Sequence, residues 1–82
     1  MYDLISFVFR GKVRREVLKK LEIAETPTTL SRKMKISRSA VSRAILELEK
    51  EGLVKCLTPN ETMGRYYEIT KLGKKVLTKI KS

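Results

Sequence analysis

The sequence predicts a mainly α-helical domain that carries one small β-hairpin. Apolar residues recur at helical spacing near both ends of the chain and through its middle, which indicates amphipathic helices. Between residues 53 and 70 the pattern changes to two short strand-like runs, 53–57 and 65–70, separated by a polar segment at 58–64 that contains turn-forming residues. The 82 residues contain no internal repeat and no linker, so we expect a single domain over 1–82.

Two helices are expected at the start of the chain. The N-terminal segment, residues 1–10, fits a helical face from Leu4 to Phe9 with Asp3 as its N-cap. A short strand is the open alternative there, because the aromatic and β-branched residues of this run favour both states. After a break near Gly11, the spacing predicts a helix over Gly11–Glu22. The apolar face of that helix consists of Val13, Val17, Leu18 and Leu21.

A helix-turn-helix is expected over residues 27–51. Thr26 can cap a short helix that has Pro27 at its first position and ends near Lys35. Ser37 can cap the next helix, residues 38–51, and Gly52 supplies a left-handed stop after it. The buried stripe of this second helix consists of Val41, Ala44, Ile45 and Leu48.

The hairpin and a last helix complete the chain. Tyr67 and Ile69 share one strand face, which we expect to enter the core, while Tyr66 lies on the other face. From residue 71 onward the helical spacing returns, with Thr70 as the expected cap of a C-terminal helix over 71–82. The predicted order is helix, helix, short helix, helix, hairpin, helix.

The net charge predicts an anionic partner. The chain has 19 Lys and Arg residues against 9 Asp and Glu residues, a formal charge of +10. Nucleic acid, an anionic membrane and an acidic protein all fit such an excess. The apolar run at residues 4–9 is too short to span a membrane and lacks the order of a secretory signal. We therefore expect a cytoplasmic protein with no membrane partner.

The distribution of the charge favours nucleic acid. From Thr26 to Leu46 there are five basic residues and no acidic one, whereas Glu47, Glu49 and Glu51 cluster at the end of the fourth helix. A merely solvated helix would favour acids in its first turn and bases in its last, because of the helix dipole. The reversed order indicates that the N-terminal end of this helix meets an anion.

Two helices joined by a short turn and followed directly by a hairpin form a winged helix-turn-helix. In such a unit the second helix enters the major groove of double-stranded DNA, and the hairpin, or wing, reaches the adjacent backbone or minor groove. We therefore expect a recognition helix at 38–51 and a wing at 53–70. The residues expected in the major groove are Arg38, Ser39, Ser42 and Arg43, and those expected at phosphates or in the wing are Arg32, Lys33, Lys35 and Arg65.

These residues also carry a resemblance to a known group of proteins. The run from Thr26 to Arg43, followed by Leu48–Val54, resembles winged-helix transcription regulators of the MarR and ArsR type, and Ile69–Gly73 resembles the end of their wing. The chain looks most similar to the small archaeal members. The resemblance implies a homodimeric, sequence-specific DNA-binding protein. It places Ser37, Arg38, Ser39, Ser42 and Arg43 in the recognition helix, and Arg65 as the groove-contacting residue of the wing.

Several other functions are disfavoured by the composition. With no His and no cluster of carboxylates we expect no catalytic residues and no enzyme activity, and the single cysteine, Cys56, excludes an internal disulfide. The Cys and His clusters of ArsR-type metal sensors are absent, so we expect no metal site and no cofactor. We interpret Cys56 as a small buried apolar residue. MarR-type proteins have longer terminal helices around a ligand pocket, which argues against a small-molecule effector here.

A homodimer and two rival functions follow from the same features. We expect the apolar segment at residues 4–9 and the basic amphipathic C-terminal helix to pack across a two-fold axis, which would set two recognition helices about one turn of DNA apart. The first rival is an architectural protein that coats DNA without sequence preference. The second is a winged helix that serves as a protein-interaction module.

Overall fold

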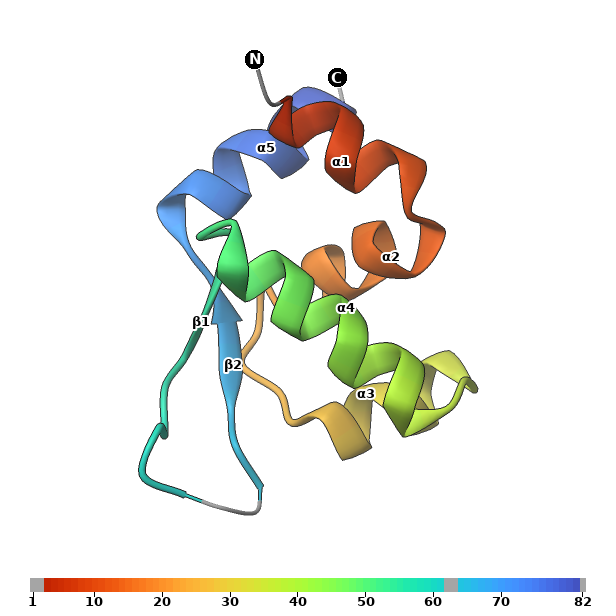
Figure 1. The fold of residues 1–82 in the computed structure, drawn as a ribbon, viewed down its shortest axis with the longest axis vertical. Helices are drawn as coiled ribbons and strands as arrows, with labels where there is room; N and C mark the ends of the chain where they lie inside the picture. The colour runs from red at the N-terminus through yellow and green to blue at the C-terminus, as the bar shows by residue number, and fades with distance from the viewer. Residues whose placement is uncertain (1–2, 62–63, 82) are drawn as a thin grey trace.

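The structure is a computed structural model, and it describes residues 3–61 and 64–81. Five helices and a two-stranded antiparallel sheet follow one another in the predicted order (Figure 1). They are α1 (Leu4–Arg10), α2 (Lys12–Lys20), α3 (Pro27–Met34), α4 (Arg38–Lys50), β1 (Val54–Cys56), β2 (Tyr67–Ile69) and α5 (Lys71–Lys81). The expected mainly helical fold with one hairpin is confirmed.

Within the N-terminal segment, residues 4–10 form a helix, so the strand alternative is wrong, and residues 1 and 2 lie outside the described residues. The Asp3 carboxylate caps α1 by accepting hydrogen bonds from the Ile5 amide at 3.0 Å and from the Ser6 hydroxyl at 2.9 Å. The hydrogen bond from Ser6 is the main cause of a lowered pKa for the Asp3 carboxyl. Gly11 then separates α1 from α2 in an extended conformation, so the break was expected at the correct residue.

Side-chain caps define both helices of the helix-turn-helix. The Thr26 hydroxyl accepts from the Thr29 amide at 3.2 Å, and the Ser37 hydroxyl accepts from the Ala40 amide at 3.1 Å. The two helices end one residue earlier than expected, at Met34 and Lys50. Lys35 is not helical; it adopts a left-handed conformation with φ 56° that turns the chain toward the cap of α4.

The strands are shorter than the expected runs, although hydrogen bonds between the two runs continue beyond them, from the Thr70 amide to the Leu53 carbonyl at 3.0 Å and from the Leu57 amide to the Tyr66 carbonyl at 2.8 Å. β1 and β2 pair with Lys55 opposite Glu68. Beyond the strands, the Leu53 amide donates to the Leu48 carbonyl at 2.9 Å, and the Thr70 hydroxyl donates to the Gly52 carbonyl at 2.7 Å. Each of these bonds joins the hairpin to the end of α4. Of the expected tip at 58–64, residues 62 and 63 lie outside the described residues.

A third segment of backbone pairs with the hairpin, and the sequence pattern did not indicate it. Glu25, just before α3, exchanges two backbone hydrogen bonds with Tyr67, at 2.9 and 3.1 Å. The segment before the helix-turn-helix is thereby fixed against the wing.

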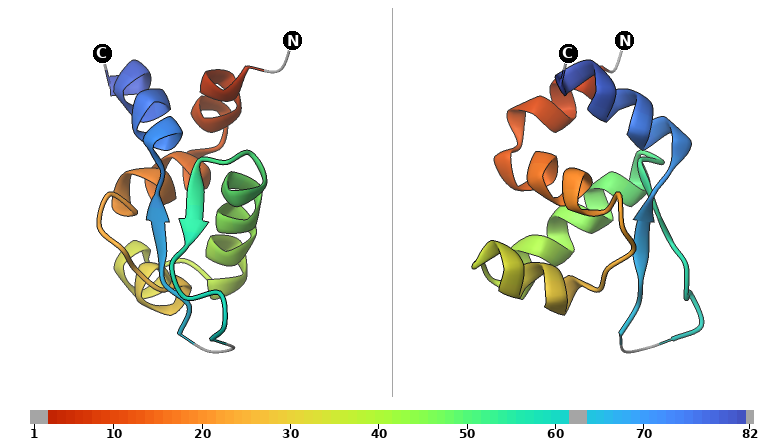
Figure 2. Two further views of the ribbon diagram at one scale, coloured as in Figure 1. Left: turned by 90° about the vertical axis from the view of Figure 1, so that its left-hand side faces the viewer. Right: turned by 180° about the vertical axis from the view of Figure 1, so that it is seen from behind.

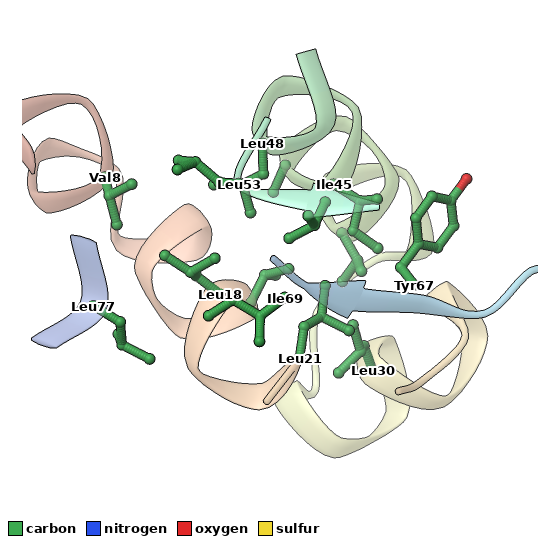
Figure 3. Close-up of a cluster of buried hydrophobic side chains, with 14 of the residues drawn as sticks. Val8, Leu18, Leu21, Leu30, Ile45, Leu48, Leu53, Tyr67, Ile69 and Leu77 are labelled. Atoms are coloured by element: carbon green, nitrogen blue, oxygen red, sulfur yellow. The ribbon is translucent and has the colours of Figure 1, made fainter. Parts of the chain in front are cut away.

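All five helices and the hairpin supply side chains to one core (Figure 3). Tyr67 and Ile69 are buried as expected, and Tyr66 is exposed. Cys56 is half-buried and packs against the core, in agreement with its interpretation as an apolar residue. The buried side chains are Val8, Val17, Leu18, Leu21, Leu30, Val41, Ala44, Ile45, Leu48, Leu53, Val54, Tyr67, Ile69, Val76 and Leu77.

The terminal helices and the hairpin tip lie at opposite ends of the long axis (Figures 1 and 2). Helices α1 and α5 lie side by side and contact each other within the chain. The segments expected to pack across a two-fold axis thus already pack on each other, which leaves only their outer side chains for a second copy. No helix in the described part of the chain is long and apolar enough to cross a membrane.

Candidate nucleic-acid interface

Helix α4 is buried on one side and exposes the residues expected to face DNA on the other. Arg38, Ser39 and Arg43 are exposed and Ser42 is half-buried, while the apolar stripe of the helix faces the core. Ser37 is exposed as well, but its hydroxyl is used as the N-cap of the helix. Helix α3 packs against α4 and supports it. The exposed face therefore presents two guanidinium groups and two hydroxyls within the first half of α4.

The exposed residues of α4 separate into two groups, each beside a different hollow. Arg38 and Ser42 face a pocket of about 300 Å³ between α4, the start of α3 and the wing, which we call the wing-side pocket. Ser39 and Arg43 face a hollow of about 510 Å³ between α4 and the start of α2, the α2-side groove. The sequence pattern indicated that these four residues form one continuous face of α4, whereas in the structure they line two separate hollows.

The wing contributes Arg65 to the first of these hollows. The Arg65 Nε donates a hydrogen bond to the Glu61 carbonyl at 2.6 Å, which ties the side chain to the backbone of the wing. Arg65 lines the wing-side pocket with Arg38. The structure thus places Arg38, which was expected in the major groove, in the same pocket as Arg65, which was expected at the phosphates or in the wing.

The other basic residues of the helix-turn-helix are exposed, but one is already paired. Lys33 forms an ion pair with Glu25, with 2.7 Å between Nζ and Oε1. The Lys33 ammonium is therefore paired in this conformation, and its expected phosphate contact, which stays a prediction, would require it to leave Glu25. Glu25 immediately precedes the acid-free stretch, and its backbone is bridged to Tyr67. Arg32 and Lys35 are exposed, and neither is in an ion pair among the described residues.

Sequence reasoning missed the role of Arg14. Its Nη1 donates to the Phe7 carbonyl at 2.5 Å, and its guanidinium lies 4.1 Å from the centre of the Phe7 ring. Its Nε lies 3.6 Å from the Glu47 carboxylate. Arg14 therefore joins α1 and α2 to α4, and it uses one of the acids displaced to the end of the recognition helix. No pattern distinguishes it from the other basic residues of α2.

The α2-side groove adds one more basic residue to the candidate interface. Lys12, at the start of α2, is exposed and lines this groove with Ser39 and Arg43. Lys12 is far from α4 in sequence, so only the fold reveals their proximity. Within residues 3–61 and 64–81, no group of three or more His, Cys, Asp or Glu side chains could hold a metal ion.

Comparison with known proteins supports the fold. Residues 25–55, which span α3, α4 and most of β1, match a family described as winged helix-turn-helix DNA-binding. No curated protein matched the chain.

Solved structures align over most of this chain. A MarR family transcription regulator aligns with 95% of this chain and 56% of its own, at 22% identity and a TM-score of 0.78. The transcriptional regulator BldR from Sulfolobus solfataricus aligns with 93% of this chain and 57% of its own, at 22% identity and a TM-score of 0.77. A mutant MarR from E. coli, complexed with operator DNA, aligns with 93% of this chain and 56% of its own, at 22% identity and a TM-score of 0.77.

This chain spans little more than half the length of those structures. At this identity the similarity concerns the fold and not the whole activity of the longer proteins. Together with the match over residues 25–55, it shows that the chain has the winged helix-turn-helix fold, with structural neighbours among MarR-family regulators.

Proposed function

We propose that the chain is a sequence-specific, double-stranded DNA-binding transcription regulator that acts as a homodimer in the cytoplasm. One observation carries the proposal: the exposed face of α4 presents basic and hydroxyl side chains beside a wing, in a chain of net charge +10. The structurally similar mutant MarR from E. coli was solved with operator DNA, which supports the same partner here. We propose no catalytic activity and no cofactor.

The recognition helix is assigned to the major groove. Ser39 and Arg43 lie one turn apart on α4 and are exposed, so they can reach base edges when the helix enters the groove. An arginine there can donate two hydrogen bonds to a guanine, and a serine can pair with several bases. Specificity is therefore assigned first to Arg43, with Ser42 and Ser39 as weaker readers.

The remaining exposed cations are assigned to the DNA backbone. Arg32 and Lys35 flank the turn between α3 and α4, and Lys12 lies across the α2-side groove from Arg43. Lys33 joins them only if DNA displaces Glu25 from it. Phosphate contacts of this kind fix the register of a protein on the duplex and do not read its sequence.

The end of the molecule away from the wing is assigned to the homodimer contact. Phe9 of α1 is 58% exposed and Leu72 of α5 is 41% exposed, although α1 and α5 already pack on each other. A second copy covering these side chains would bury apolar area and leave both wings free.

Selection from a pool of random duplexes tests the proposal. A sequence-specific regulator should enrich one motif, and a two-fold repeat within it would support the homodimer. Strong binding without enrichment would instead support the architectural rival. Phosphate contacts are stronger at about 50 mM salt than at physiological salt, so the absence of any duplex binding at that concentration would favour the protein-interaction module.

Replacing Arg43 by alanine should weaken binding to the selected duplex by about 2 kcal/mol, roughly thirtyfold in Kd, if the side chain reads a guanine. Binding to mixed-sequence DNA should change much less, and competition titrations measure both. The matched control is Lys75→Ala, an exposed cation of α5 at the opposite end of the molecule. Equal losses on both duplexes would show that Arg43 contacts only a phosphate.

A further inference from the structure

The wing-side pocket gathers groups that attract an anion. Arg38 enters it from the start of α4 and Arg65 from the wing, and the residues between them include Ser42 and Thr28. No acidic residue is among those that line the pocket. Two positively charged side chains therefore face one hollow of about 300 Å³ without a counter-charge.

Neither guanidinium takes part in an ion pair among the described residues. Arg14 is paired with Glu47 and Lys33 with Glu25, and Arg38 and Arg65 belong to neither pair. The hydrogen bond from Arg65 Nε to the Glu61 carbonyl occupies one donor and leaves the two Nη groups. A guanidinium held in this way is already oriented and loses little side-chain freedom when it binds an anion.

The start of α3 adds a third source of positive charge. Pro27 occupies the first helical position and has no N–H, and the Thr26 hydroxyl accepts from the Thr29 amide at 3.2 Å. Thr28, between them, has one of the first-turn amides that no intrahelical bond can satisfy. Because Thr28 lines the pocket, this helix end adds its partial positive charge to that of the two arginines.

We propose that the wing-side pocket binds one phosphodiester group of the DNA backbone, which Arg38 and Arg65 share. This inference rests on the proposed function and deepens it. Planar guanidinium groups suit phosphate oxygens, and a shared phosphate removes the repulsion between the two arginines. Arg65 then fixes the wing to the backbone beside the recognition helix and does not read the minor groove, and Arg38 becomes a backbone contact.

The salt dependence of binding tests whether the phosphate is shared. Dissociation constants for a mixed-sequence duplex are measured between about 50 and 200 mM salt, where each neutralised phosphate adds about 0.9 to the log–log slope. With one shared phosphate, the Arg38→Gln/Arg65→Gln double variant should lose about 0.9 of slope per protomer, and each single variant less than that. The control Lys75→Gln, on α5, should leave the slope unchanged.

Separate contacts give a different result. If Arg38 and Arg65 neutralise different phosphates, each single variant loses about 0.9 and the double variant about 1.8, and the proposal is overturned. Because the duplex has a mixed sequence, this outcome is distinct from a failure of sequence specificity, which the random-duplex selection reports. If the unaltered chain binds no duplex, both proposals are wrong.

A second measurement locates the phosphate. Duplexes with a single neutral methylphosphonate are compared position by position on the selected sequence. The unaltered chain should lose affinity at each contacted phosphate, and in each half-site one such position, next to the recognition-helix contact, should have no further effect on the double variant. Two positions, each sensitive to only one of the arginines, would contradict a shared site.

Discussion

Replacing Leu18 by alanine is expected to lower the free energy of unfolding by about 4 kcal/mol, because a large buried side chain is removed and its cavity closes only in part. Leu18 is fully buried on α2, and Figure 3 shows it between the side chains of Leu77 and Ile69. An 82-residue domain has a total stability of about 4 to 12 kcal/mol, so this loss is a large fraction of it. Urea unfolding monitored by circular dichroism measures the change.

The matched control for Leu18 is Leu46→Ala on α4. Leu46 is 59% exposed and belongs to neither the core nor the proposed homodimer contact, so its truncation should cost no more than about 1 kcal/mol. Similar losses for the two leucines would contradict the description of one core that joins α2 to α5 and the hairpin.

A second large effect is expected at Gly73, in the first turn of α5. This glycine is buried, and a β-carbon on it would overlap the Leu53 carbonyl oxygen and lie 2.6 Å from Cγ1 of Ile69. Alanine would otherwise favour the helix by about 1 kcal/mol. Because the overlap is with backbone, we expect Gly73→Ala to lower the free energy of unfolding by about 3 kcal/mol.

Gly11→Ala is the control for this substitution. At Gly11 the three atoms nearest to a β-carbon all belong to the Arg14 side chain, the closest being Nε at 2.6 Å, so a side chain with contacts to Phe7 and Glu47 has to shift, and not the backbone. The cost should therefore stay below that of Gly73→Ala, at about 1 kcal/mol, in the same unfolding experiment. A stable Gly73→Ala variant would show that the close contact between α5 and the hairpin is not required.

Most of the fold was predictable from short-range patterns. The caps at Asp3, Thr26, Ser37 and Thr70 each have the expected side chain at the expected helix start. The left-handed Gly52, with φ 77°, follows α4 as expected. Such features depend on neighbours within a few residues, and a single sequence contains them fully.

The features that could not be predicted depend on distant residues. Glu25 is bridged to the wing and also pairs with Lys33. A count of charged residues over 26–46 leaves out Glu25, so it does not reveal this ion pair. Lys35 was expected to be helical, because nothing in a lysine side chain favours the left-handed conformation that it adopts.

The candidate site was predicted as a set of residues but not as an arrangement. Helical spacing alone places Arg38 and Arg43 on one broad face, whereas the wing and α2 flank that face on opposite sides. Lys12, Arg14 and Thr28 have no pattern that marks them, since their positions relative to α4 arise only in the folded chain.

The position of α1 and α5 has a functional consequence. These helices lie at the end of the long axis, which measures 34 Å, away from the wing (Figure 1). A second copy that bound at this end, where the homodimer contact is proposed, would not collide with a duplex at the other end. Dimerisation and DNA binding could therefore occur in either order.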